Sequence, residues 1–160
     1  MAAAYPLQGL KTVRDRRLNT SVKERILRQQ QHEQACHAAV AKRKELEDYR
    51  IYMVEESSRR YQELFKSTHS LKEIEQFNAS IKRLYAGEFE LEEEVKKAEH
   101  AAAKAQEEFN KARAAETECR KKLQKLETHQ QIWETEQRLY EERAADMELE
   151  DFIPRDKAFR

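Results

Sequence analysis

An unbroken seven-residue repeat of apolar residues runs from residue 74 to residue 147. All eleven d positions and seven of the eleven a positions are apolar. The d positions are Phe77, Leu84, Leu91, Ala98, Ala105, Ala112, Cys119, Leu126, Trp133, Tyr140 and Met147. A strict heptad repeat underwinds an α-helix to about 3.5 residues per turn and wraps it around a partner helix. The pattern therefore predicts a long coiled-coil helix over about residues 71–150.

A weaker heptad pattern predicts an earlier helix over about residues 7–66. In the frame that begins at Val22, seven of thirteen a and d positions are apolar: Val22, Ile26, Cys36, Val40, Val54, Tyr61 and Leu64. Residues 67–70 break the pattern, and Ser70 with Glu73 has the spacing of a capping box that begins a helix. Gly87 lies inside the later helix and predicts a local bend at most.

Two long helices joined by a short turn predict an all-α fold, a single elongated domain over residues 1–160. The expected arrangement is an antiparallel coiled-coil hairpin. A turn centred between Thr68 and His69 places Leu7 opposite Gln130, so that residues 131–150 have no partner helix within the chain.

The apolar stripe continues through this unpaired segment at Trp133, Tyr140 and Met147. An exposed apolar stripe usually marks a contact surface. Two alternatives stay open: the N-terminal residues fold back over the segment, or two molecules pair through it.

Composition favours helices with a thin core, since 39% of residues are charged and only two are glycine and two proline. No apolar run is long enough to span a bilayer, and residues 1–5 lack the features of a signal peptide. We therefore expect a cytoplasmic protein without membrane insertion. A net charge of zero disfavours nucleic-acid binding.

Charges concentrate at the open end of the predicted hairpin. Residues 10–28 hold seven basic and two acidic side chains, and residues 110–127 hold six basic and three acidic ones. This basic collar includes Arg14, Arg17, Lys121 and Lys122. Residues 134–151 are acidic, with eight carboxylates and two arginines. Either these charges are solvated faces, or an acidic partner pairs with the collar.

Nothing in the chain predicts an enzyme, because it has no glycine-rich phosphate loop, nucleophile elbow or His–acid–nucleophile pattern. Two helices also offer no concave pocket. The histidines and cysteine at His32, Cys36, His37 and His100 do not predict a metal site, and Cys36 and Cys119 lie too far apart in the hairpin to form a disulfide. We expect no cofactor.

Several short segments resemble a known family. They are Tyr5-Pro6-Leu7, residues 48–52 (DYRIY), Leu64-Phe65, and, after the turn, Leu71, Phe77 and residues 81–84 (IKRL). On these the chain resembles the YscO/FliJ family, the central stalk proteins of type III secretion systems and flagellar export. The injectisome branch is closer than the flagellar one.

The resemblance implies a non-catalytic hairpin, like the shaft of a rotary ATPase, at the inner-membrane base of the secretion apparatus. One end enters the pore of the hexameric export ATPase, the other reaches the export gate protein, and some members bind escort chaperones. The ATPase end would comprise Trp133, Tyr140, Met147, Arg14, Arg17, Lys121 and Lys122. The gate end maps onto Phe77, Ile81, Leu84 and Glu88.

The four gate-end residues are also a and d positions, which should face the first helix, so core packing is an open alternative for them. Two other functions also stay open. A generic scaffold coiled coil would self-associate in parallel and would leave residues 67–70 unexplained. A substrate chaperone would be compact and strongly acidic.

Overall fold

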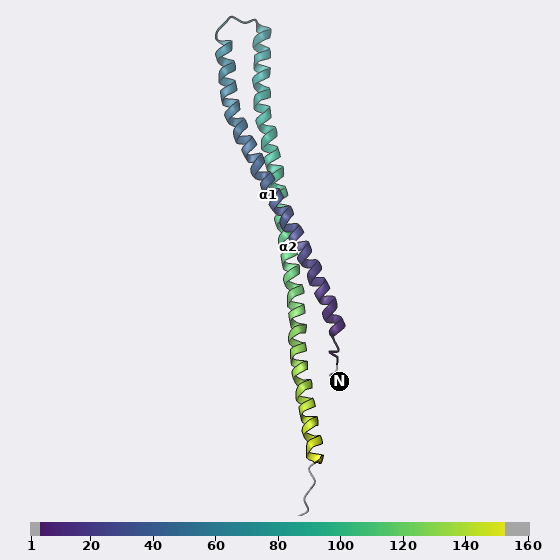
Figure 1. Ribbon diagram of the computed structural model, residues 1–160. Coiled ribbons are helices and arrows are strands. Elements are labelled where there is room, and N and C mark those ends of the chain that lie inside the picture. The colour runs from purple at the N-terminus through teal and green to yellow at the C-terminus, as the bar shows by residue number, and fades with distance from the viewer. Residues whose placement is uncertain (1–3, 153–160) are drawn as a thin grey trace, which may run out of the picture. The chain divides into compact units, whose positions relative to one another are not determined.

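The computed structural model of the protein describes residues 4–152 of the 160-residue chain. Within this range it contains two α-helices, α1 over Gln8–Leu64 and α2 over Leu71–Phe152 (Figure 1). Each boundary lies within two residues of the sequence prediction. The all-α fold of two long helices is confirmed.

The turn between the helices ends in the predicted capping box. The backbone N–H of Ser70 donates to Oε2 of Glu73 at 2.6 Å, and the backbone N–H of Glu73 donates to Oγ of Ser70 at 3.4 Å. These bonds satisfy donors that the first turn of α2 leaves without an intrahelical acceptor. The backbone N–H of Ser70 and, after it, the Ser70 hydroxyl donate to the Glu73 carboxylate and lower its pKa. The chain reverses direction here (Figure 1).

The contacts divide the chain into two compact units. Unit 1 comprises Met1–Glu24 and Arg113–Arg160, and unit 2 comprises Arg25–Ala112. Each unit contains one segment of α1 and one of α2.

Within each unit the two segments run antiparallel. In unit 2, Lys42 pairs with Glu94, Tyr49 with the carbonyl of Leu84, and Tyr61 with Phe77. The partners on α2 therefore move back toward the turn as α1 advances. In unit 1, Tyr5 meets Trp133 and Arg14 meets the carbonyl of Lys122. The predicted hairpin pairing is confirmed.

The buried positions of α2 follow the predicted heptad frame. They are Ile81, Leu84, Val95 and Ala112 in unit 2, and Glu116, Leu123 and Leu126 in unit 1. Every one is an a or d position. Glu116 is the buried acid of this set, and its Oε1 accepts a hydrogen bond from Nη2 of Arg120 at 2.7 Å. The repeat thus assigned the inner face of α2 correctly.

The frame predicted for α1 is wrong by one residue. The buried residues are Ala39, Leu46 and Met53, whereas Val40 and Val54, assigned to the inner face, are 60% and 64% exposed. Ile26 and Tyr61 are exposed as well.

Polar matching explains the shift. The observed inner face brings Lys42 to Glu94 and lets Tyr49 hydrogen bond to the carbonyl of Leu84. A count of apolar residues gives no weight to these polar contacts of Lys42 and Tyr49. In α1, apolar residues occupy neighbouring heptad positions, so more than one face of the helix could turn inward. The contacts with α2 determine which face does.

Candidate partner-binding surfaces

The residues predicted for the gate end lie against α1. Ile81 and Leu84 are buried, and Phe77 is half-buried with its ring edge-on to Tyr61 at a centroid distance of 5.0 Å. Glu88 accepts a hydrogen bond from Nε of Arg50 at 2.7 Å. All four therefore take part in the packing that the sequence analysis left open as the alternative. Ile81 and Leu84 can meet a partner only if α1 moves away.

Ion pairs join the helices beside this stripe. Arg50 spans Glu88 and Glu92, with N–O distances of 2.7 and 2.6 Å, and both carboxylates raise the pKa of its guanidinium. Lys42 contacts Glu45 and Glu94, each at 2.9 Å, and these bonds raise its pKa. Arg43 pairs with Glu99 at 2.7 Å. Lys42, Arg43 and Arg50 are thus paired within the chain.

Gly87 provides space for Tyr49, which sequence reasoning missed. The Tyr49 hydroxyl donates to the carbonyl oxygen of Leu84 at 2.7 Å. A Cβ atom at Gly87 would lie 2.9 Å from Cζ of Tyr49, which is closer than real Cβ atoms approach. The glycine therefore marks a close contact between helices, whereas the sequence predicted only a local bend. α2 continues through it.

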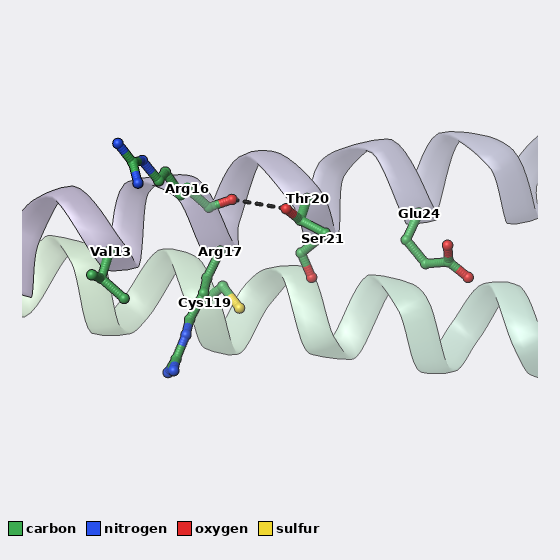
Figure 2. A pocket seen from close by; sticks show the side chains of 7 residues that line it. All are labelled: Val13, Arg16, Arg17, Thr20, Ser21, Glu24 and Cys119. Carbon is green, nitrogen blue, oxygen red and sulfur yellow. Dashed lines mark hydrogen bonds between the residues drawn. The ribbon is translucent and has the colours of Figure 1, made fainter.

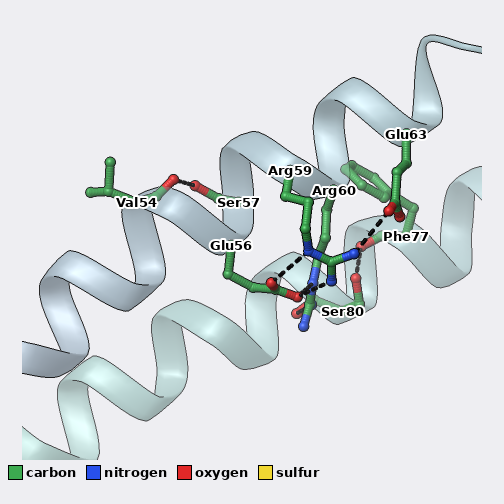
Figure 3. Close-up of polar contacts among 8 residues, drawn as sticks. All are labelled: Val54, Glu56, Ser57, Arg59, Arg60, Glu63, Phe77 and Ser80. Atoms are coloured by element: carbon green, nitrogen blue, oxygen red, sulfur yellow. Dashed lines mark hydrogen bonds and ion pairs between the residues drawn. The ribbon is translucent and has the colours of Figure 1, made fainter.

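A second polar cluster lies on α1 closer to the turn (Figure 3). The Glu56 carboxylate accepts hydrogen bonds from Arg59 and Arg60, and Arg60 also donates to the carbonyl of Ser80 on α2 at 3.3 Å. Arg59 first, then Arg60, lowers the pKa of Glu56 to about 2. Glu63 completes the cluster through Arg59 at 2.8 Å. Polar groups therefore occupy the inner face of α1 near the turn.

Large apolar side chains are exposed around the turn. Phe65 and Leu71 flank it, and both are far more exposed than Phe77. Tyr61 stacks on Phe65 with a centroid distance of 6.4 Å, and Ile74 follows on α2. Sequence reasoning quoted Phe65 and Leu71 only for the family resemblance. Their positions at the ends of two helices, where neither has a full helical partner, could have indicated exposure.

Trp133 has a partner within the chain, which corrects the prediction of an unpaired segment from residue 131. Tyr5, only 7% exposed, packs on Trp133 with a ring-centroid distance of 5.6 Å. Its hydroxyl also forms a 2.8 Å hydrogen bond with Nδ1 of His129. The N-terminal residues therefore fold back onto α2, as one open alternative held. Tyr5, an aromatic residue directly before Pro6, was the sequence signal available for this contact.

Within residues 4–152, α2 continues without a helical partner beyond this contact. We call residues 134–152 the C-terminal extension. Tyr140 and Met147, two of the predicted ATPase-end residues, are 71% and 68% exposed. Leu149 and Phe152 are also exposed, and so is every residue from 138 to 152. This part of α2 is therefore exposed to solvent on all of its faces.

The predicted basic residues of the ATPase end lie on both helices of unit 1. Nη1 of Arg14 donates to the carbonyl of Lys122 at 2.8 Å, and Lys121 lies 3.4 Å from Glu118. Arg17 borders a shallow groove of about 610 Å³ between α1 and Cys119 of α2 (Figure 2). The other residues of the groove are Val13, Arg16, Thr20, Ser21 and Glu24.

The thiols and histidines show no metal centre in the described part of the chain. Both cysteines are free and half-buried. Sγ of Cys36 lies 3.3 Å from Nε2 of His32, whose ring stacks on Phe109 at 6.0 Å. Among residues 4–152, no group of three or more His, Cys, Asp or Glu side chains could hold a metal ion. Nor is any described helix long and apolar enough to cross a membrane.

Comparison with known proteins places the chain in a family. A family model described as type III secretion protein YscO matches residues 7–155. The solved structure of CT670 from Chlamydia trachomatis, titled as a proposed YscO homologue, superposes with a TM-score of 0.77 at 21% sequence identity, covering 93% of this chain and 91% of that one. That likeness shows a shared fold. A search of curated proteins finds no match. The chain belongs to the YscO family of type III secretion proteins.

Proposed function

We propose that the protein is a non-catalytic stalk of the type III secretion export apparatus, in the injectisome, on the cytoplasmic side of the inner membrane. Unit 1 binds the hexameric export ATPase and unit 2 binds the export gate. The family match over residues 7–155 supports the secretion role. The observation that carries the ATPase assignment is the C-terminal extension, a single helix exposed on all sides from residue 138 to 152.

A ring-shaped partner fits this extension better than a flat one. A flat surface covers one face of a helix, whereas the pore of a hexamer surrounds it. Apolar residues lie on several faces of the extension: Tyr140 and Met147 share one, and Leu149 and Phe152 lie on others. Buried aromatic residues are common hot spots in protein interfaces. The basic residues Arg14, Arg17, Lys121 and Lys122 would then meet acidic groups at the pore entrance.

The gate contact in unit 2 begins at the turn. Phe65 and Leu71 are exposed there, and Phe77 is half-buried beside them. We assign the first contact to these three residues. Ile81, Leu84 and Glu88 follow only where the partner displaces α1, and the polar character of the inner face near Glu56 and Arg60 lowers the cost of that displacement.

The test measures binding of purified ATPase hexamer to the chain carrying Tyr140→Ala and Met147→Ala. Because neither residue packs on α1, helicity and melting temperature should stay unchanged. Affinity should fall by roughly tenfold or more, since loss of a hot-spot side chain costs about 2 kcal/mol or more.

The matched control carries Phe65→Ala and Leu71→Ala, which removes two exposed apolar side chains from unit 2. It should bind the ATPase normally and the gate protein weakly, whereas the Tyr140/Met147 variant should do the reverse. ATPase binding that is unaffected by the Tyr140/Met147 changes would rule out the extension as the ATPase site.

A further inference from the structure

Two oppositely charged surfaces of unit 1 lie next to each other along α2. We call residues 10–24 and 113–127, the part of the basic collar inside unit 1, the unit 1 collar. It holds ten basic and five acidic side chains, while the C-terminal extension holds eight acidic and two basic ones. A surface with both signs side by side can complement a copy of itself turned through a half-rotation.

Most of the charges that matter here are not neutralised within the chain. In residues 4–152, the side chains of Arg16, Arg17, Lys122 and Lys125 form no ion pair. The same holds for the acids of the extension from residue 141 onward: Glu141, Glu142, Asp146, Glu148, Glu150 and Asp151. Both sets of charges are therefore available to a second molecule.

The collar also has an apolar recess that suits the apolar side chains of the extension. The groove of about 610 Å³ is lined by Val13, Thr20, Ser21 and Cys119, and by the charged side chains of Arg16, Arg17 and Glu24 (Figure 2). On a helix of 3.6 residues per turn, Tyr140 and Met147 lie on one face, with Glu136, Arg143 and Asp151 beside them. An acidic helix with an apolar stripe suits a groove that is lined by Val13 and Cys119 and that has two arginines against one glutamate.

We propose that two copies of this chain pair through a two-fold axis beside residues 129–130, each laying its C-terminal extension in the collar groove of the other. That axis is midway between Cys119 and Tyr140, so Tyr140 of one copy faces Cys119 of the other. With this axis, residues 134–146 of one copy, about 20 Å of helix, lie along residues 113–125 of the other, and residues 147–152 pass beyond the unit 1 collar. The contact is isologous and closes at two molecules.

Direct pairing of the two extensions is the competing arrangement. It would join the two apolar stripes, but it would also bring eight acids of one copy beside eight of the other. Like charges placed across an interface oppose association. The offset that lays each extension along the collar replaces this repulsion with attraction. The dimer also covers Tyr140 and Met147, so it would exclude an ATPase ring from them, although the pairing itself requires no ATPase.

Sedimentation of the isolated full-length chain tests the pairing. We expect a dimer with a dissociation constant of roughly micromolar order, the weak end for interfaces of ordinary size. It should weaken by roughly tenfold or more between about 0.1 and 1 M salt, because the Debye length falls from about 10 to about 3 Å. A chain that stays monomeric at low salt and high concentration overturns the proposal.

Charge reversal gives a sharper test. One variant carries Glu136→Lys and Glu141→Lys, and a second carries Arg16→Glu and Arg17→Glu. Each alone should be monomeric, because like charges then meet at both contacts. An equimolar mixture should form a heterodimer, in which each extension again meets a collar of opposite charge. The control Glu55→Lys, an exposed reversal in unit 2, should dimerise normally, and circular dichroism checks that all variants are helical.

Cross-linking tests the register. Tyr140→Cys in a Cys36→Ser background should form intermolecular disulfides with Cys119 when oxidised glutathione accepts the thiol electrons. Positions 119 and 140 lie about 31 Å apart along one helix, so the bond cannot form within a chain. Adding Cys119→Ser should abolish it. A cross-link that persists without Cys119 would show the extensions pairing with each other and would refute the collar contact.

Discussion

The two units hold their helices together with different chemistry. In unit 2 cations of α1 meet carboxylates of α2: Lys42 with Glu94, Arg43 with Glu99, and Arg50 with Glu88 and Glu92. In unit 1 the hydrogen bonds from α1 cations end on neutral acceptors. Lys11 donates to the side-chain amide of Gln130, and Arg14 donates to a backbone carbonyl.

This difference separates structural charges from charges available to partners. A carboxylate neutralises a bound cation, whereas an amide or carbonyl oxygen leaves its net charge in place. Unit 2 therefore uses much of its charge to join its own helices. Unit 1 keeps a basic collar and an acidic extension, and joins its helices through Leu123, Leu126 and the Tyr5–Trp133 contact.

The largest expected effect concerns the apolar packing of unit 1. Leu126→Ala should lower the free energy of unfolding by about 2–3 kcal/mol, the low end for a buried leucine, because a two-helix core relaxes readily around the gap. Urea denaturation measures it. Leu84→Ala in unit 2 should cost a similar amount, since both leucines are 6% exposed.

The same substitution at an exposed site is the control. Leu139 lies in the C-terminal extension, where its side chain is exposed. Leu139→Ala should therefore change the free energy of unfolding by less than about 0.5 kcal/mol. Equal losses at Leu126 and Leu139 would show that the inner face of unit 1 is assigned wrongly.

A smaller effect, different in two backgrounds, is expected at Gly87. Alanine favours a helix by about 1 kcal/mol over glycine. In the wild-type chain its Cβ would displace Tyr49 and break the hydrogen bond to the Leu84 carbonyl, so Gly87→Ala should stabilise little or destabilise. In a Tyr49→Ala background the same change should stabilise by about 1 kcal/mol.

A double-mutant cycle measures this coupling. Equal stabilisation by Gly87→Ala in both backgrounds would mean that Tyr49 does not pack over the glycine. Unit 2 would then lack the close contact between helices that distinguishes it from unit 1.

The smallest effect compares two arginines directly. Arg50→Ala removes a cation that bridges two carboxylates and should lower the melting temperature slightly at low salt, with the difference shrinking as salt screens the pairs. Arg17→Ala removes an unpaired cation from a basic region and should leave stability unchanged or slightly raised. A loss at Arg17 as large as that at Arg50 would contradict the division between structural and partner-facing charges.

Sequence reasoning located both helices and the inner face of α2. It did not locate the inner face of α1 or the contact of Tyr5 with Trp133. The heptad of α2 has an apolar residue at every d position, so only one frame is possible. α1 has apolar residues in neighbouring columns, and a count favoured Val40 and Val54 over the buried Ala39 and Met53. Tyr5 was overlooked because it precedes the helix and belongs to no repeat.

The sequence by itself determined the two helices, their turn at Ser70 and the face of α2 that is buried, because these depend on local spacing and capping. Tertiary structure alone decided which face of α1 turns inward, what Gly87 accommodates and where the unpartnered part of α2 begins. Those features depend on pairs of residues distant in the chain, such as Tyr49 with Gly87 and Tyr5 with Trp133. Periodicity within one helix carries no information about the polar groups and ring shapes that the other helix brings to it.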